Sequence, residues 1–92
     1  MTPLTPEEAS RRASALEGWR IESGALVKTF QFADFVGALA FVNRVGEAAE
    51  TAGHHPDIDI RYNKVRLALI THDAGGLTAK DFDLAAQADK SA

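Results

Sequence analysis

The sequence contains no cysteine, which excludes disulfide bonds, zinc ribbons and thiol nucleophiles. It has no apolar run near the ~20 residues that a membrane-spanning helix needs. The first ten residues carry neither a basic start nor an apolar stretch, so we expect no signal peptide. The lack of cysteine suits a reducing cytosol without demanding one, and a cytoplasmic location is therefore the expectation.

Several functional motifs are also absent. The chain has no Gly-rich phosphate loop, no Ser nucleophile elbow and no dinucleotide fingerprint. It lacks a basic excess: 10 Lys and Arg against 13 Asp and Glu give a net charge of −3, which argues against nucleic acid as a direct partner. The chain has 92 residues, of which 46% are hydrophobic and 25% are charged. This length and composition are typical of one globular domain, spanning residues 1–92.

Two helices are marked by local capping chemistry. Thr5 is a cap residue followed by proline and two acids, which predicts a helix from Pro6 to about Leu16. Asp34 caps the longest periodic segment of the chain, and Gly53 ends it. One apolar stripe at helical spacing runs along this segment, and we expect it to cover a sheet. Its members are Phe35, Ala38, Leu39, Val42, Val45 and Ala49.

Alternation of apolar and polar residues predicts two β-hairpins. The first joins residues 19–22 to residues 26–32 through a Ser23-Gly24 turn. The second joins residues 58–62 to residues 65–71, and we expect Asn63-Lys64 to form its two-residue turn. Both hairpins present apolar residues on one face only, as a half-buried sheet requires.

A third helix is predicted from Thr78 to about Ala88. The segment Thr78 to Asp81 has the form of a capping box, with Asp in place of the usual Glu or Gln. The element order is then αββαββα. Hairpins joined by helices indicate an α+β fold, a two-layer sandwich in which a four-stranded antiparallel sheet carries its helices on one face.

All three histidines, His54, His55 and His72, flank the second predicted hairpin. With a turn at Asn63-Lys64, the register places His55 opposite His72, and His54 lies beside them at the junction of helix and strand. Neighbouring imidazoles can share neutral and cationic forms, so that one donates a proton while another accepts one. This arrangement favours acid/base chemistry near neutral pH.

Other interpretations of these residues stay open. A single histidine in a small domain is more often a surface or structural residue than a functional one. Three imidazoles with a carboxylate from Asp57, Asp59 or Asp73 could form a metal site, but the side chains of His54-His55 point apart in an extended chain. Asp81 at the third position of its helix satisfies backbone donors whatever the function.

One set of spaced residues extends over much of the chain: Glu50, His54-His55-Pro56, Tyr62-Asn63-Lys64-Val65, Thr71-His72-Asp73, Gly76-Leu77-Thr78 and Asp81. This set resembles the signature of the pterin-4a-carbinolamine dehydratases. The joint spacing is far more specific than a lone His-His-Pro. The sequence differs from some family members at three positions: Gly53 replaces an acid, Ile58 an aromatic residue and Lys80 an arginine. These differences bear on the affinity of the pocket and on its substrate preference.

The resemblance implies a lyase that removes water from 4a-hydroxytetrahydrobiopterin and gives quinonoid dihydropterin, in the recycling of tetrahydropterins. No metal or organic cofactor is used in that family. Its motif histidines surround the pterin hydroxyl and correspond to His54, His55 and His72, of which we expect His54 and His72 to transfer protons. The expected substrate contacts are Glu50, Thr71, Asp73 and Asp81.

Two further functions remain alternatives. Members of the family in animals also serve as a dimerisation cofactor for a transcription factor, through their helical face, so a protein-interaction module is one alternative. Action on a different pterin is the other. Family members are dimers or tetramers, and the exposed edges of a four-stranded sheet invite pairing with a second copy, so we expect a homodimer or homotetramer.

Overall fold

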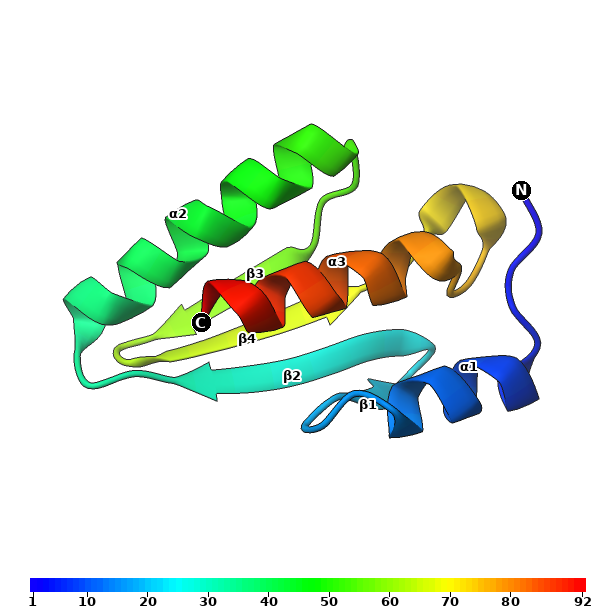
Figure 1. Ribbon diagram of the computed structural model, residues 1–92, viewed down its shortest axis with the longest axis horizontal. Helices are drawn as coiled ribbons and strands as arrows, with labels where there is room; N and C mark the ends of the chain where they lie inside the picture. Colours follow the sequence, from blue (N-terminus) through cyan, green and yellow to red (C-terminus); the bar gives the residue numbers. More distant parts are fainter.

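The computed structural model describes residues 1–92 and contains the predicted order of helices and strands (Figure 1). A short 3-10 turn, η1, lies between the last strand and the last helix. The elements are α1 (Pro6–Ser14), β1 (Arg20–Glu22), β2 (Ala25–Gln31), α2 (Phe35–Ala52), β3 (Asp57–Arg61), β4 (Lys64–Leu69), η1 (His72–Ala74) and α3 (Ala79–Ser91).

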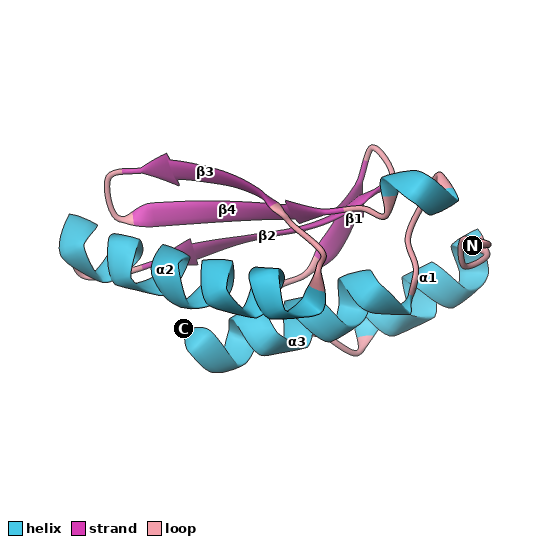
Figure 2. Ribbon diagram, turned by 90° about the horizontal axis from the view of Figure 1, so that it is seen from above, coloured by secondary structure: helices cyan, strands magenta, loops and turns pink.

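The four strands form one antiparallel sheet in the order β1-β2-β4-β3. Figure 2 shows the sheet edge-on, with α1, α2 and α3 all on the same side of it. The predicted α+β two-layer sandwich is therefore confirmed. No helix is both long enough and apolar enough to cross a membrane.

The predicted caps are present. The Thr5 hydroxyl accepts a hydrogen bond from the Glu8 N–H, and the Asp34 carboxylate accepts one from the Gly37 N–H. Gly53 ends α2 with φ of 63°, the left-handed conformation that glycine adopts without a steric penalty. Only the helix ends differ: α1 stops two residues before Leu16, and α3 runs past Ala88 to Ser91.

The buried face of α2 differs from the predicted stripe. Phe41, which the stripe omitted, is fully buried and packs against Phe30 and Phe32, with ring centroids 4.6 and 4.9 Å apart. Phe35 and Leu39, which the stripe included, are 44% and 39% exposed. The buried residues of α2 are Ala38, Phe41, Val45 and Ala49, and α2 packs against both the sheet and α3.

The register of the second hairpin also differs from the prediction. The turn is formed by Tyr62-Asn63, one residue earlier than expected, so Ile60 pairs with Val65. Asn63 is held in place by Phe32, because its side-chain amide donates to the Phe32 carbonyl at 2.8 Å and its carbonyl accepts from the Phe32 N–H at 2.8 Å. The shift of two positions in pairing keeps the apolar residues on the core face.

The predicted cross-strand pair of His55 and His72 is wrong. Strand β3 begins only at Asp57, and β4 ends at Leu69, so neither histidine belongs to the ladder. His72 instead opens η1. The histidines are brought near each other by the loops that follow α2 and β4, and not by strand pairing.

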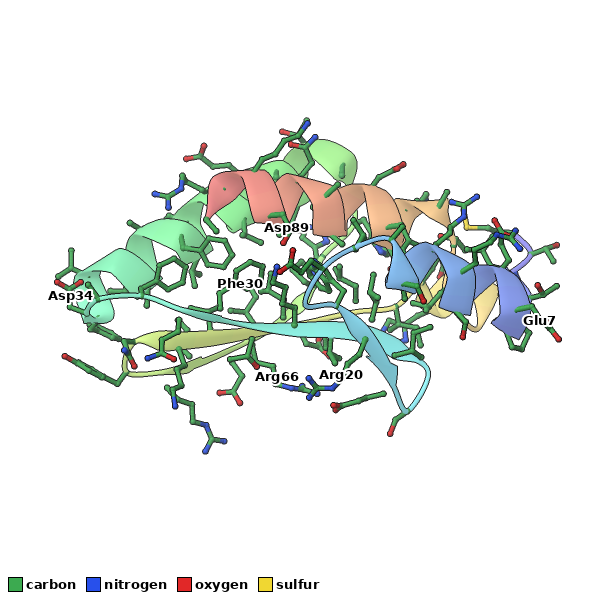
Figure 3. All side chains as sticks on the ribbon, turned by 60° about the horizontal axis from the view of Figure 1, so that its bottom comes forward. Glu7, Arg20, Phe30, Asp34, Arg66 and Asp89 are labelled. Atoms are coloured by element: carbon green, nitrogen blue, oxygen red, sulfur yellow. The ribbon has the colours of Figure 1, made fainter.

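A partly buried polar contact holds the last turn of α3 against the sheet. The Trp19 indole N–H lies 3.1 Å from both oxygens of the Asp89 carboxylate, and Lys28 Nζ lies 2.8 Å from Asp89 Oδ1. Figure 3 shows Asp89 and Phe30 on the side of the sheet that faces the helices. An acid in the last helical turn is unfavourable to the helix dipole, and Lys28 offsets this.

The other face of the sheet is uncovered and carries paired charges. Figure 3 shows Arg20 and Arg66 on this side, away from the helices. Both arginines bond to the Glu22 carboxylate and hold its pKa below the ordinary value of 4.5, chiefly through the hydrogen bond from Arg20. This face has no helix packed on it, and its ion pairs make it polar.

Candidate active site

The end of α2 places the first histidine. Gly53 turns the chain through its left-handed conformation, and the His54 N–H donates to the Ala49 carbonyl at 3.1 Å. This bond draws His54 back under the last turn of α2, where the first turn of α3 is its neighbour. The His54 side chain is only 11% exposed.

The segment after β4 places the third histidine. Thr71 forms an isolated antiparallel bridge with Gly76, and the five residues from Thr71 to Gly75 close a tight loop through backbone hydrogen bonds of 3.0 to 3.1 Å. This loop contains η1 and presents His72 and Asp73 to solvent. In Figure 1, η1 lies beside the first turn of α3.

These loops and the start of α3 line an open cavity of about 280 Å³. The volume is close to the ~300 Å³ at which small-molecule pockets begin. All three histidines line it, as the sequence predicted. Its lining residues are Gly53, His54, His55, Ile70, Thr71, His72, Asp73 and Lys80.

Asp81 lies directly behind this cavity and is completely buried. Its Oδ2 accepts two hydrogen bonds, from the Thr71 hydroxyl at 2.8 Å and from the Thr78 N–H at 2.9 Å. The Thr78 hydroxyl in turn donates to the Thr71 hydroxyl, 2.8 Å away, since the only Thr71 proton is used on Asp81. Asp81 Oδ1 is left for one partner, His54 Nε2, at 2.6 Å.

This network determines the tautomer of His54. An ionised carboxylate only accepts hydrogen bonds, so the hydrogen must reside on His54 Nε2. Nδ1 has no hydrogen-bond partner in the protein, and because every buried polar side-chain atom has one, Nδ1 must be accessible. His54 therefore has an accessible Nδ1 that is free to bond to another molecule, and a buried carboxylate on its Nε2.

His55 is held differently. Its Nε2 bonds to the Glu50 carboxylate in the last turn of α2, and both side chains are largely exposed, at 62% and 78%. A solvent-exposed pair of this kind contributes little to stability. No group of three or more His, Asp and Glu side chains converges in a way that could hold a metal ion.

Known proteins are similar to this chain in both sequence and fold. The sequence model of the family described as "Pterin 4 alpha carbinolamine dehydratase" matches residues 2–91. The chain belongs to this dehydratase family. A relative from Acidobacterium capsulatum is 60% identical over 86 residues, 94% of each chain, and one from Chloroflexus aurantiacus is 54% identical over 90 residues, 98% of this chain and 97% of the relative. Both bear the name pterin-4-alpha-carbinolamine dehydratase provisionally.

Two solved structures show the same architecture. The crystal structure of a transcriptional coactivator/pterin dehydratase from Brucella melitensis is 32% identical, with a TM-score of 0.95 and 99% of both chains covered. A pterin dehydratase-like protein identified as a RuBisCO assembly factor in the alpha-carboxysome is 23% identical, with a TM-score of 0.65 over 79% of this chain and 84% of its own; it shares the fold. The resemblance found in the sequence is confirmed.

The seven residues expected from the dehydratase signature take different places. Five of them line the cavity: His54, His55, Thr71, His72 and Asp73. The other two, Glu50 and Asp81, do not line it: Glu50 is connected to it through His55, and Asp81 through His54 and Thr71. The Thr71 hydroxyl is directed at Asp81, so this side chain supports the carboxylate.

Two residues of the candidate site received less weight in the sequence analysis than the structure gives them. Lys80 lines the cavity but was noted only as a departure from the family signature. Thr78 was predicted as a helix cap, and it also donates to Asp81 and Thr71. The signal for Thr78 was the capping box itself, because the acid of a capping box bonds to the N–H of its cap residue.

Proposed function

We propose that this protein dehydrates 4a-hydroxytetrahydropterins to quinonoid dihydropterins and water by acid/base catalysis from its histidines. The proposal rests chiefly on one observation: the ring of His54 stands between the buried carboxylate of Asp81 and a cavity that His55 and His72 also line. Membership of the dehydratase family supports the same reaction class. The recycling of tetrahydropterins is the setting in which such a reaction is needed.

In the proposed reaction, a protonated imidazole donates to the hydroxyl oxygen on C4a, and the C4a–O bond breaks as water leaves. The lone pair of the adjacent ring nitrogen N5 forms the C4a=N5 bond. The proton of N5 passes to a neutral imidazole, so that atoms and charge balance. A positioned general acid or base contributes typically 10²–10⁴-fold to a rate.

His54 and His72 are the proposed proton-transfer groups. Asp81 holds the His54 ring in one tautomer and stabilises the imidazolium form during transfer, as the aspartate of a Ser-His-Asp triad does. His55 is bonded to Glu50, which makes binding of the substrate its proposed role. Asp73 and Lys80 add one charge of each sign to the wall of the cavity.

Alanine variants of the three histidines test this proposal. We expect His54→Ala and His72→Ala each to lower kcat by about 10²–10⁴-fold, since each loses one proton-transfer group. His55→Ala is expected to raise KM with kcat little changed, as removal of uniform binding does. The measurement is dehydration of synthetic 4a-hydroxytetrahydrobiopterin, with folding of each variant checked by circular dichroism. Unchanged turnover in all three variants would reject the proposal.

Protein interaction is a second candidate function. The first two turns of α2 expose apolar side chains, with Phe35, Val36 and Leu39 44%, 73% and 39% exposed. The Brucella melitensis relative is described as a transcriptional coactivator as well as a pterin dehydratase. A homodimer or homotetramer is the simplest assembly that would cover this face, and the proposed dehydration does not depend on it.

Charge placed on this face separates the two functions. We expect Val36→Asp to lower the mass measured by light scattering while dehydration is retained, because a buried unpaired carboxylate is unfavourable in an interface. Asn43→Asp, which adds the same charge to an exposed polar position of α2, is the control. Equal masses for the unaltered protein and both variants would count against association through this face.

A further inference from the structure

A second cavity of about 240 Å³ lies between α2 and α3, next to the histidine cavity. His54 and Lys80 line both cavities, so the two adjoin at these residues. Nothing in the proposed proton transfer uses the second cavity. The residues that line it are Ala48, Ala52, His54, Lys80, Asp83, Leu84 and Gln87.

The chemistry of the substrate connects the two cavities. In a 4a-hydroxytetrahydropterin, the reacting carbon C4a is separated by only one ring nitrogen, N5, from C6, the carbon that carries the side chain. A ring bound with C4a at His54 therefore has its C6 substituent starting beside His54 as well. His54 lines the second cavity as well, so a substituent that starts beside His54 would have this cavity next to it.

We propose that the cavity between α2 and α3 is the binding site for the C6 side chain of the pterin, an inference that rests on the proposed dehydration. Its lining suits a short hydroxylated chain. One wall is a face of α3 whose residues recur at helical spacing: Lys80, Asp83, Leu84 and Gln87. All of them except Leu84 are exposed and supply polar groups. The Asp83 carboxylate accepts hydrogen bonds from hydroxyls, and the Gln87 amide both donates and accepts.

The wall of this cavity that α2 forms is made of small side chains and has no polar groups apart from His54 at its end. Ala48 and Ala52 are one turn apart on α2, and their small side chains leave the cavity open. Both residues and Gln87 also line a wider groove of about 600 Å³ that continues between the two helices to Ser91. A substituent longer than a few carbons is therefore not blocked.

Filling the cavity tests the inference. Ala52→Leu adds three carbons at an exposed position in the last turn of α2, where leucine is well tolerated by the helix. We expect this variant to weaken the binding of biopterin, which carries a dihydroxypropyl chain, about tenfold more than that of 6-methylpterin, by the discrimination that a pocket makes for a few carbons. Gln87→Leu should act in the same direction, by loss of hydrogen bonds.

Binding of these oxidised pterins is measured by quenching of their fluorescence, which needs no turnover. Ala15→Leu makes the same change at an exposed residue that lines neither cavity and serves as the control. A selective loss for biopterin supports the side-chain site. Equal effects on both pterins, or none, overturn it. Failure of the dehydration assay with selective binding intact would reject the proposed reaction and leave the binding site standing.

Discussion

Asp81→Asn is expected to lower dehydration by about 10²–10⁴-fold while the protein stays folded. Oδ2 of the carboxylate receives two hydrogen-bond donors, the Thr71 hydroxyl and the Thr78 N–H, so the carbonyl oxygen of an asparagine must occupy that position. Its NH₂ group then faces His54 Nε2, which can pair with it only as an acceptor. The hydrogen of the neutral imidazole moves to Nδ1, the nitrogen offered to the substrate.

The wrong tautomer is the physical cause of this loss. The corresponding change of aspartate to asparagine in a Ser-His-Asp triad lowers kcat about 10⁴-fold with the geometry intact. The kinetic readout is kcat for 4a-hydroxytetrahydrobiopterin, with KM little changed if only proton transfer suffers. Asp57→Asn, at an exposed carboxylate of β3 outside the cavity, is the matched control. Full activity of the Asp81 variant would show that His54 does not work through this carboxylate.

Local chemistry predicted most of the fold. The caps at Thr5, Asp34 and Thr78 and the stop at Gly53 depend on side chains within a few residues of the backbone groups that they satisfy, so they could be read from the sequence. The alternation in the two hairpins likewise depends on neighbours. The αββαββα order follows from these local signals, which is why the two-layer sandwich was predicted correctly.

The errors concern contacts between distant segments. Asn63 forms the turn together with Tyr62 because Phe32, 31 residues earlier, bonds to it, and no local signal marks that contact. Phe41 is buried because it packs against Phe30 and Phe32, which come from the other hairpin, and the apolar face of α2 is therefore centred away from the predicted stripe. Both depend on how whole elements meet, and a periodicity within one element does not contain that information.

The candidate site combines both kinds of information. The capping box predicted that Asp81 would bond to the N–H of Thr78, and it does. The contact of Asp81 with His54 joins residues 27 positions apart and gives the acid its proposed role. The histidines were predicted to converge through a strand register that proved wrong, yet they share a cavity, because the loops after α2 and β4 meet at the start of α3.

Phe41→Ala is expected to lower the free energy of unfolding by about 3–5 kcal/mol. The ring is fully buried and packs against Phe30 of β2 and Phe32, which follows β2. Its removal therefore leaves a cavity in the core and also loses the free energy of burying the ring. For a chain of this length a total stability of about 5–14 kcal/mol is typical, and the loss is therefore a large fraction of the whole. Denaturant unfolding followed by circular dichroism gives the measurement.

Phe35→Ala is the matched control, since it removes the same ring from the same helix at a position that is 44% exposed. We expect this variant to lose less than about 1 kcal/mol in the monomer, because little buried apolar surface is removed. Phe41 also holds α2 over the sheet, and α2 ends at the residues that carry His54. A folded Phe41 variant with an unchanged melting transition would contradict the view that this ring anchors the helix that positions His54.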